Sequence, residues 1–278
     1  MPGASGNKPC WLCTNVVAKR SGWARGRAVL VDLSESDTTK FVQITDVDLW
    51  ANVDALAALK HQVNNKTFER HEKILGLTHN ESSVLACRGL RDFFHPIQHI
   101  WADPAHVILA NGVFAWAIWE LIERLHTRTR LSWRSLGNLF SEIDWRIPVS
   151  AGHTANRYHK RALFSEERIR ASRESDAHVY KGGMGDLLMM LRPLLFFCNA
   201  RVHDSGNTPG VAAAVAAFKA MALLVECFFC PQVARSWARA RMPDLVRVVK
   251  QAFDLHFAAY PGDVKPKWHT LLHLPRPP

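Results

Sequence analysis

The stretch from residue 103 to residue 125, DPAHVILANGVFAWAIWELIERL, decides the fold that we expect for this chain of 278 residues. It predicts a helix, because Asp103 is a good N-terminal cap and Pro104 suits the first turn, where its missing N–H loses no partner. Apolar residues lie on nearly every side of this helix, so it should be buried on more than one face. Further helical patterns lie on both sides of it in the sequence.

Apolar periodicity predicts further helices over residues 46–61, 67–75, 131–143, 164–173, 180–202, 211–230, 233–240 and 243–260. Asp46 is the expected cap of the first, and Gly76 is expected to end the second. Two β-branched runs, at residues 28–32 and 41–44, predict a small hairpin or two edge strands. We therefore predict a mainly α protein. Residues 1–62 would hold a Cys-x-x-Cys segment, a small β element and the first helix, and residues 63–275 a helical domain closed by a His-x-x-x-His turn.

The most apolar stretch, residues 210–230, contains Lys219 and Glu226. A charge near the centre of a bilayer is costly, so we predict a buried core helix and no membrane partner. Residues 1–8 contain no apolar run, so no secretory signal is expected and the six cysteines should stay reduced. The expected location is intracellular, in the nucleus or the cytoplasm.

The chain is basic, with 35 Lys and Arg against 25 Asp and Glu, a net charge of +10. A guanidinium group pairs with phosphate through two hydrogen bonds, so this composition predicts a polyanionic partner, most plausibly nucleic acid. We place the contacts on Arg-rich faces within residues 124–134, 157–173 and 235–247. The alternative is a non-enzymatic helical protein-interaction module whose charge only serves solubility. The candidate DNA-binding residues are Arg128, Arg130, Arg134, Arg157, Lys160, Arg161, Arg170 and Arg173.

Two pairs of metal-ligating residues lie near opposite ends of the chain. Cys10 and Cys13 form a C-x-x-C pair, whose thiolates can bind one Zn²⁺ from a tight turn. His269 and His273 are four residues apart and share one face of a helical turn. Together they provide the four ligands of a structural zinc ion, although an exposed cysteine pair and an unrelated histidine turn remain the alternative. A second C-x-x-C pair, residues 227–230, ends an apolar helix and is expected to be buried and inert.

Asp103 and His106 place an acid and an imidazole on the first turn of the decisive helix. An N-terminal cap followed by a satisfied histidine explains the pair without any chemistry. The sequence contains no H-E-x-x-H, Walker, G-x-S-x-G or dinucleotide-binding motif. A stand-alone metalloprotease, NTPase or serine hydrolase is therefore not expected.

Three features occur in one order: Cys10-x-x-Cys13, Asp103-x-x-His106 followed by Ala-Asn-Gly, and KPKWHTLLHLP at residues 265–275. In this order the chain resembles cut-and-paste (DDE-type) transposases of the CACTA type and the related Kyakuja-like and recombinase-like groups, over residues 10–275. The resemblance implies that the cysteine and histidine pairs complete a zinc site. It also implies that Asp103 and His106 belong to the family's C/D-x-x-H motif at the start of a helical insertion domain, near the active site.

The same resemblance implies two aspartates and a glutamate that hold two Mg²⁺ ions. The aspartates are expected before the cysteine pair and the glutamate after the histidine pair, but residues 1–9 and 274–278 contain no acid. We therefore expect a transposase-derived, catalytically incomplete DNA-binding domain with structural zinc, and Mg²⁺ only where acids are supplied elsewhere. Glu142 and Asp144 beside Asp103, forming an unusual active nuclease, are the remaining alternative. A homo-oligomer is compatible with either interpretation.

Overall fold

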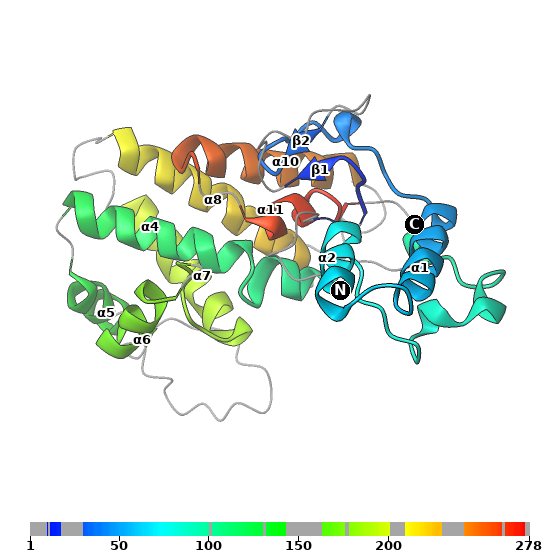
Figure 1. Ribbon diagram of the computed structural model, residues 1–278. Coiled ribbons are helices and arrows are strands. Elements are labelled where there is room, and N and C mark those ends of the chain that lie inside the picture. Colours follow the sequence, from blue (N-terminus) through cyan, green and yellow to red (C-terminus); the bar gives the residue numbers. More distant parts are fainter. Residues whose placement is uncertain are drawn as a thin grey trace. The chain divides into compact units, whose positions relative to one another are not determined.

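The computed structural model describes residues 10, 12–17, 30–99, 102–129, 132–142, 163–175, 178–200, 209–229, 242–262 and 265–275. These residues are mainly helical, with a two-stranded sheet near the N-terminus, which confirms the predicted fold class (Figure 1). The chain forms two compact units, one of Met1–Ala102 with Val264–Pro278 and one of Asp103–Asp263. The boundary predicted at residue 62 falls inside the first unit, between its first two α-helices.

In the first unit, the described residues of the two β-branched runs each pair with the cysteine segment through backbone hydrogen bonds. Strand β1 (Val16–Val17) pairs in parallel with β2 (Val31–Asp32), and Gln43 forms an antiparallel bridge with Cys13. The described part of these runs is therefore not the predicted hairpin, whereas Val31–Asp32 is an edge strand, the other predicted form. The other elements of this unit are the 3₁₀ turns Thr38–Lys40, Val84–Ala86 and Arg88–Leu90 and the helices α1 (Asp46–Leu59), α2 (Asn65–Leu75), α3 (Pro96–His99) and α11 (Pro266–Leu271).

Helix α1 is capped by Thr45 and not, as predicted, by Asp46. The Thr45 hydroxyl accepts a hydrogen bond from the Asp48 N–H at 3.1 Å, and the Asp48 carboxylate accepts one from the Thr45 N–H at 3.0 Å. This reciprocal pair is a capping box. The Asp46 carboxylate instead accepts the N–H of Ile97 at 2.8 Å, so it ties the start of α1 to α3.

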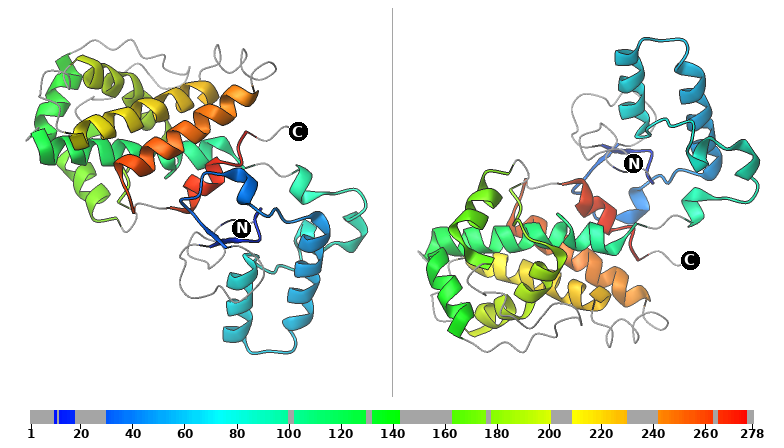
Figure 2. Two further views of the ribbon diagram at one scale, coloured as in Figure 1. Left: turned by 90° about the horizontal axis from the view of Figure 1, so that it is seen from above. Right: turned by 90° about the horizontal axis from the view of Figure 1, so that it is seen from below.

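Helices α1 and α2 form an antiparallel pair joined by a short turn (Figure 2). Asn64 caps α2 by accepting the N–H of Thr67 at 2.9 Å. Gly76 ends the helix in the left-handed conformation, with φ of 67°, as predicted. No residue of α2 is fully buried, so this helix keeps much of its surface in solvent.

In the second unit, α8 (Pro209–Phe229) packs against both α4 (Val113–Thr129) and α10 (Met242–Ala259), and these three long helices form the core (Figure 1). Phe114 of α4 stacks on Phe218 of α8 with ring centroids 5.9 Å apart. The predicted helix over residues 233–240 lies outside the described residues. The remaining helices are α5 (Trp133–Glu142), α6 (Glu166–Arg173) and α7 (Met184–Ala200), the last containing Pro193.

The helix predicted over residues 103–125 is broken near its start. A π-turn, Ala105–Leu109, is closed by the bond from the Ala110 N–H to the Ala105 carbonyl at 2.9 Å. Asn111 then adopts a left-handed conformation with φ of 50°, and α4 begins at Val113. The prediction of one continuous helix was wrong, because the apolar pattern runs through the break and does not reveal it.

Two helical stretches are long and apolar enough to cross a membrane by length and composition, Ala105–Arg128 and Gly210–Phe229. In their most apolar windows, 72% and 61% of the residues are buried inside the protein. The core helix of a water-soluble fold meets the same criterion. The burial of Gly210–Phe229 against α4 and α10 favours the predicted core helix.

Candidate metal centre

Backbone pairing holds the cysteine segment in place within the first unit. The Leu12 carbonyl accepts the N–H of Ile44 at 3.0 Å, and the Thr14 N–H donates to the Val42 carbonyl at 2.8 Å. Leu12 and Ile44 are both buried. These bonds flank Cys13, so its side chain projects from a paired stretch of backbone and not from a free loop.

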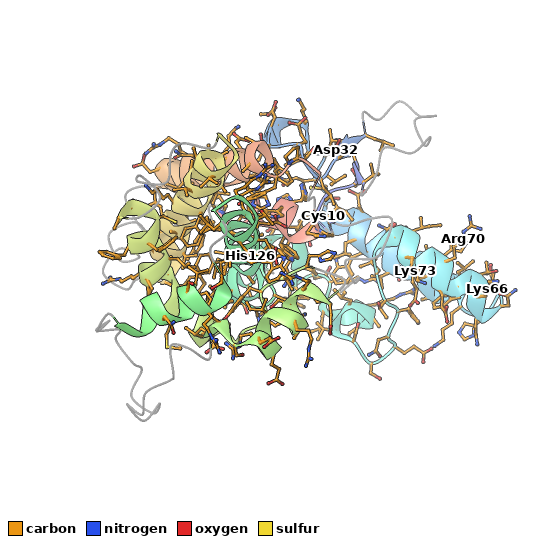
Figure 3. All side chains as sticks on the ribbon, turned by 90° about the vertical axis from the view of Figure 1, so that its left-hand side faces the viewer. Cys10, Asp32, Lys66, Arg70, Lys73 and His126 are labelled. Carbon is orange, nitrogen blue, oxygen red and sulfur yellow. The ribbon has the colours of Figure 1, made fainter. Side chains whose placement is uncertain are left out.

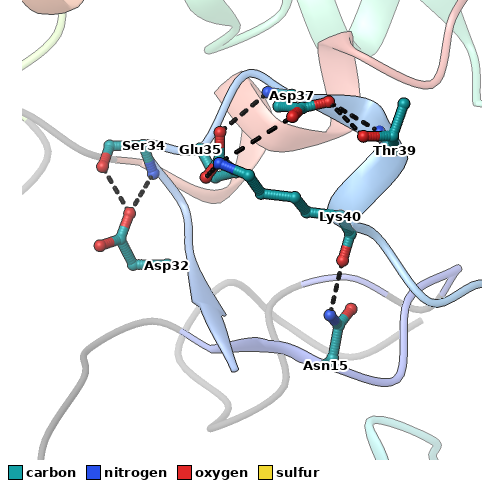
Figure 4. A network of polar contacts seen from close by, with 7 residues as sticks. All are labelled: Asn15, Asp32, Ser34, Glu35, Asp37, Thr39 and Lys40. Atoms are coloured by element: carbon teal, nitrogen blue, oxygen red, sulfur yellow. Dashed lines mark hydrogen bonds and ion pairs between the residues drawn. The ribbon is translucent and has the colours of Figure 1, made fainter. Parts of the chain in front are cut away.

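Asn15 fixes the same segment with its side chain, which is buried. Its amide nitrogen donates to the Lys40 carbonyl at 2.8 Å, and its amide oxygen accepts the N–H of Val42 at 2.9 Å. Figure 4 shows Asn15 below a turn in which Lys40 pairs with Glu35 at 2.7 Å and the Asp37 carboxylate accepts the N–H of Thr39. A buried amide satisfied on both sides defines one register between the two segments.

The histidines come from α11, as the spacing predicted. Pro266 occupies the first turn of this helix, and His269 lies within it. The N–H of His273 bonds the Thr270 carbonyl at 3.1 Å, so helical winding continues to the second histidine. Trp268 and Leu271 are fully buried, so α11 has a buried apolar face.

The four predicted ligands meet at one point. The Sγ of Cys10 lies 3.5 Å from the Nε2 of His273, and the Sγ of Cys13 lies 3.5 Å and 3.3 Å from the Nε2 atoms of His269 and His273. The two Nε2 atoms are 3.0 Å apart, and all four ligand atoms lie within 4.8 Å of one another. The four residues are buried, so this cluster could hold a metal ion.

Three S···N separations and the N···N separation are close to those of a tetrahedral ion, whereas the largest separation within the cluster, 4.8 Å, exceeds the S···S edge of about 3.8 Å. With metal–sulfur bonds of about 2.3 Å and metal–nitrogen bonds of about 2.0 Å, a tetrahedron has S···N edges of about 3.5 Å and an N···N edge of about 3.3 Å. The S···N distances of 3.3 to 3.5 Å lie close to these values, and the N···N distance of 3.0 Å is slightly shorter. Four protein ligands would fill a tetrahedral shell, so the site is suited to a structural ion and not to one that binds substrate.

The electrostatics favour a thiolate at the site. The contact with Cys13 is the main reason that the pKa of Cys10 falls far below its ordinary value of 9.0, to about 2. Burial opposes this shift, and His269 and His273 contribute to it. Thiolate is the form of cysteine that binds metal, so the cluster is prepared for an ion at neutral pH.

An aromatic ring covers the histidines. The buried Phe41 meets the His269 ring edge to face with centroids 4.6 Å apart, and it lies 6.0 Å from the His273 ring. The Nδ1 atom of His269 is buried and has no hydrogen-bond partner among the described residues. Since Nε2 faces the thiols, Nδ1 is the atom left to carry the proton when Nε2 binds a metal.

The described cysteines outside the cluster have no such setting. Burial raises the pKa of Cys227 to about 11 and that of Cys198 to about 12, which keeps both as inert thiols. This outcome matches the interpretation of the second C-x-x-C pair for Cys227, while Cys230 lies outside the described residues. Cys87 is exposed. None of the five described cysteines forms a disulfide bond.

Asp103 and His106 contact each other in the second unit. The Nδ1 of His106 meets one carboxylate oxygen of Asp103, whose other oxygen accepts the Ala105 N–H at 2.8 Å. The His106 contact lowers the pKa of Asp103. Both side chains are exposed, and no third acid, histidine or cysteine joins them in a metal-binding group among the described residues. The Glu142 side chain and Asp144 lie outside the described part of the chain.

The predicted DNA-binding residues are only partly described. Arg128, Arg134 and Arg170 are exposed, and Arg173 pairs with Glu123 at 2.7 Å. The positions outside the described residues are Arg130, Arg157, Lys160 and Arg161.

Three supporting residues were missed by the sequence analysis, namely Asn15, Phe41 and Thr45. Only Thr45 carries a local signal, the T-x-x-D spacing of a capping box. The comparisons with protein-family models, curated proteins and solved structures give no match to this chain.

Proposed function

We propose that Cys10, Cys13, His269 and His273 bind one structural Zn²⁺, in a transposase-derived and catalytically incomplete DNA-binding protein. The proposal depends above all on one observation: four ligand atoms, supplied by residues more than 250 positions apart in sequence, lie within 4.8 Å of one another. An ion bound there would join the two segments of the first unit.

The ligand set favours zinc among the common metals. Two thiolates and two imidazoles in tetrahedral geometry form a preferred zinc site, whereas Mg²⁺ and Ca²⁺ require oxygen ligands. Zinc is not redox-active and imposes no geometric preference of its own, so a buried tetrahedral cluster accepts it without strain.

The zinc proposal is tested by metal content. Purified protein should contain one zinc per chain by inductively coupled plasma mass spectrometry. Cys13→Ser and His273→Ala should each lose most of it, because a three-ligand site binds far more weakly. Cys87→Ser and His61→Ala change the same residue types at exposed positions outside the cluster, and both should retain full zinc. Equal zinc in all four variants would refute the assignment.

The DNA-binding part of the proposal is supported by the net charge of +10 and by exposed arginines of the second unit. Arg128, Arg134 and Arg170 form no ion pair with any described residue, so their guanidinium groups are available to phosphate. Replacing all three by alanine should weaken binding to a fluorescein-labelled 20-base-pair duplex. Affinity of the unmodified protein should fall steeply between 50 and 200 mM salt, because phosphate contacts release counterions. An affinity that salt does not change would contradict the proposal.

The proposed lack of catalysis follows from the lack, in the described part of the chain, of clustered acidic residues that could bind two metal ions. Among the described residues, Asp103 contacts His106 and belongs to no group of three or more residues that could hold a metal ion. A two-metal reaction needs several carboxylates around the ions. Incubation of supercoiled plasmid with the purified chain and Mg²⁺ should therefore leave the plasmid intact, and nicking that Asp103→Asn abolishes would overturn this part.

A second candidate function is a protein-interaction module. In the first unit, Phe93 is 80% exposed, and Val84 and Leu90 of the same loop region are also exposed. Large apolar side chains in solvent are typical of protein-binding surfaces when they cluster. Under this alternative, Phe93→Ser would abolish partner capture, and the arginine substitutions above would have no effect on it.

A further inference from the structure

We propose that Lys66, Arg70 and Lys73 of helix α2 form a contact surface for the phosphate backbone of duplex DNA. The inference rests on the proposed DNA-binding function, and it places a contact surface in the unit that contains the candidate metal centre. The sequence analysis assigned DNA contacts only to residues of the other unit.

The three cations lie on one side of α2. Positions 66, 70 and 73 are separated by four and three residues, so their side chains project from the same helical face. All three are exposed, and Figure 3 shows them spaced along the helix. The rise of 1.5 Å per residue places the first and last about 10 Å apart along the axis.

That length suits a nucleic-acid backbone. Phosphates of one DNA strand advance about 3.4 Å along the duplex axis per nucleotide. The basic row, which consists of Lys66, Arg70 and Lys73, therefore extends over the length of about three nucleotides. Lys and Arg side chains are long and flexible enough to reach individual phosphates from a helix lying parallel to the duplex axis. The expected contacts position the protein and carry no base specificity.

These cations are not neutralised within the described structure. Lys66, Arg70 and Lys73 form no ion pair with any described carboxylate. The Glu72 carboxylate of the same helix accepts the N–H of His79 at 2.7 Å and forms no ion pair with the three cations. Glu69 is exposed at the edge of the row, so the face keeps an excess of two positive charges.

Other cations of this unit contrast with the row. Lys40 pairs with Glu35 at 2.7 Å, Lys60 with Glu81 at 2.7 Å, and Arg91 with Asp54 at 2.7 Å. The six acidic residues between positions 32 and 54 are likewise engaged in caps, turns and ion pairs. Among the described residues of this unit, the cations without an ion pair are therefore concentrated on α2.

Helix α2 is also held firmly enough to present this face. Its ends are defined by the Asn64 cap and by the left-handed Gly76, and it packs against α1. Phe68 meets the ring of His79 edge to face with centroids 6.0 Å apart, on the side away from the basic row. A preorganised helix loses little entropy when it binds, so three contacts can contribute measurably.

The test uses the zinc-loaded chain of 278 residues and a labelled 20-base-pair duplex of arbitrary sequence. The variant Lys66→Ala/Arg70→Ala/Lys73→Ala should keep its helical content, because alanine is the best helix former. Each lost phosphate contact lowers the salt slope by about 0.9, so the slope of log K against log [NaCl] should fall in magnitude by about 2 to 3. Affinity should weaken at least tenfold at 100 mM NaCl.

The matched control is Lys40→Ala/Lys60→Ala/Arg88→Ala, which removes the same charge from residues that already have carboxylate partners. Its salt slope should equal that of the unmodified protein. Equal effects of the two triple variants would overturn the inference, because net charge alone would then explain the binding. An unchanged slope in the α2 variant would overturn it as well.

Failure of the inference can be told from failure of the proposed function. If the chain binds duplex and only Arg128→Ala/Arg134→Ala/Arg170→Ala weakens it, the proposed function stands and the α2 surface is refuted. If the unmodified chain does not bind duplex at all, both fall. In a last measurement, binding to vesicles of phosphatidylcholine with 30% phosphatidylserine is compared between the unmodified chain and the α2 variant, since basic helices also bind anionic membranes. Loss of vesicle binding without loss of duplex binding in the α2 variant would refute the DNA assignment.

Discussion

At the scale of the residue, Gly112 determines how the chain enters α4. A Cβ atom built there would lie 2.4 Å from the Ile108 carbonyl carbon and 2.4 Å from the Val107 oxygen. Backbone atoms cannot move aside as a flexible side chain can, so Gly112→Ala should destabilise the protein by about 2 kcal/mol or more. Urea unfolding followed by circular dichroism measures this loss.

Gly185 in α7 provides the matched control, because nothing lies within 4 Å of an added Cβ atom there. Gly185→Ala should leave stability unchanged or raise it by about 0.5 kcal/mol, since alanine restricts the unfolded chain and favours helix. Equal destabilisation by both substitutions would show that the packing at Gly112 is not the cause.

A second residue-scale prediction concerns pH. The pKa of Cys10 is about 2 in the folded protein, below its ordinary value of 9.0, so the unfolded chain binds more protons at this thiol. The stability that Cys10 contributes is full above about pH 9 and declines as the pH falls toward 2. Metal-free protein should therefore unfold at a higher urea concentration at pH 8.5 than at pH 6. Cys10→Ser should reduce this difference, and an unchanged difference would argue against a thiolate.

At the scale of the element, the capping box of α1 makes a measurable contribution. Thr45→Ala removes the acceptor for the Asp48 N–H and should cost about 1 kcal/mol of stability. Val47 is 77% exposed on the same turn, so Val47→Ala should change stability by less than about 0.5 kcal/mol. Thermal unfolding of the two variants under one condition checks the prediction, which fails if Thr45→Ala is silent.

Several elements could be predicted from the sequence because their signals are local. Apolar periodicity predicted α8 and α10, and Gly76 predicted the end of α2. The pairing of β2 with β1 could not be predicted in this way, because it joins residues in separate segments and depends on tertiary contacts. The cap of α1 was misplaced by one residue, because Thr45 and Asp46 are both good caps and only backbone geometry selects between them.

At the scale of the whole molecule, the two units should respond differently to loss of metal. Removal of zinc by a strong chelator should increase amide hydrogen exchange over residues 10–44 and 265–275, which the proposed ion joins. Core amides of α4, α8 and α10 should stay protected, because these helices pack on one another and supply no metal ligand. Hydrogen-exchange mass spectrometry measures both regions, and uniform deprotection of the chain would contradict independent units.

The candidate site was predictable at this scale because its ligand types and spacings are specific. Cys-x-x-Cys and His-x-x-x-His each constrain one side of a tetrahedron, and their combination leaves one simple solution. The basic row on α2 was missed because three cations among polar residues are ordinary on a solvated helix. The row can be recognised only in the structure, where neighbouring cations form ion pairs with carboxylates and these three do not.

The wide separation of the metal ligands has a consequence for biosynthesis. Cys10 and His273 are 263 positions apart, so at about 5 to 20 residues per second the ribosome needs about 13 to 50 seconds to make the second after the first. The helices of residues 103–263 can fold and pack together during that interval, while the two thiols still lack their imidazole partners. The nascent chain therefore passes through a stage in which oxidants or a competing metal can reach Cys10 and Cys13. If the ribosome stalls before residue 269, the two cysteines stay exposed to these reactions.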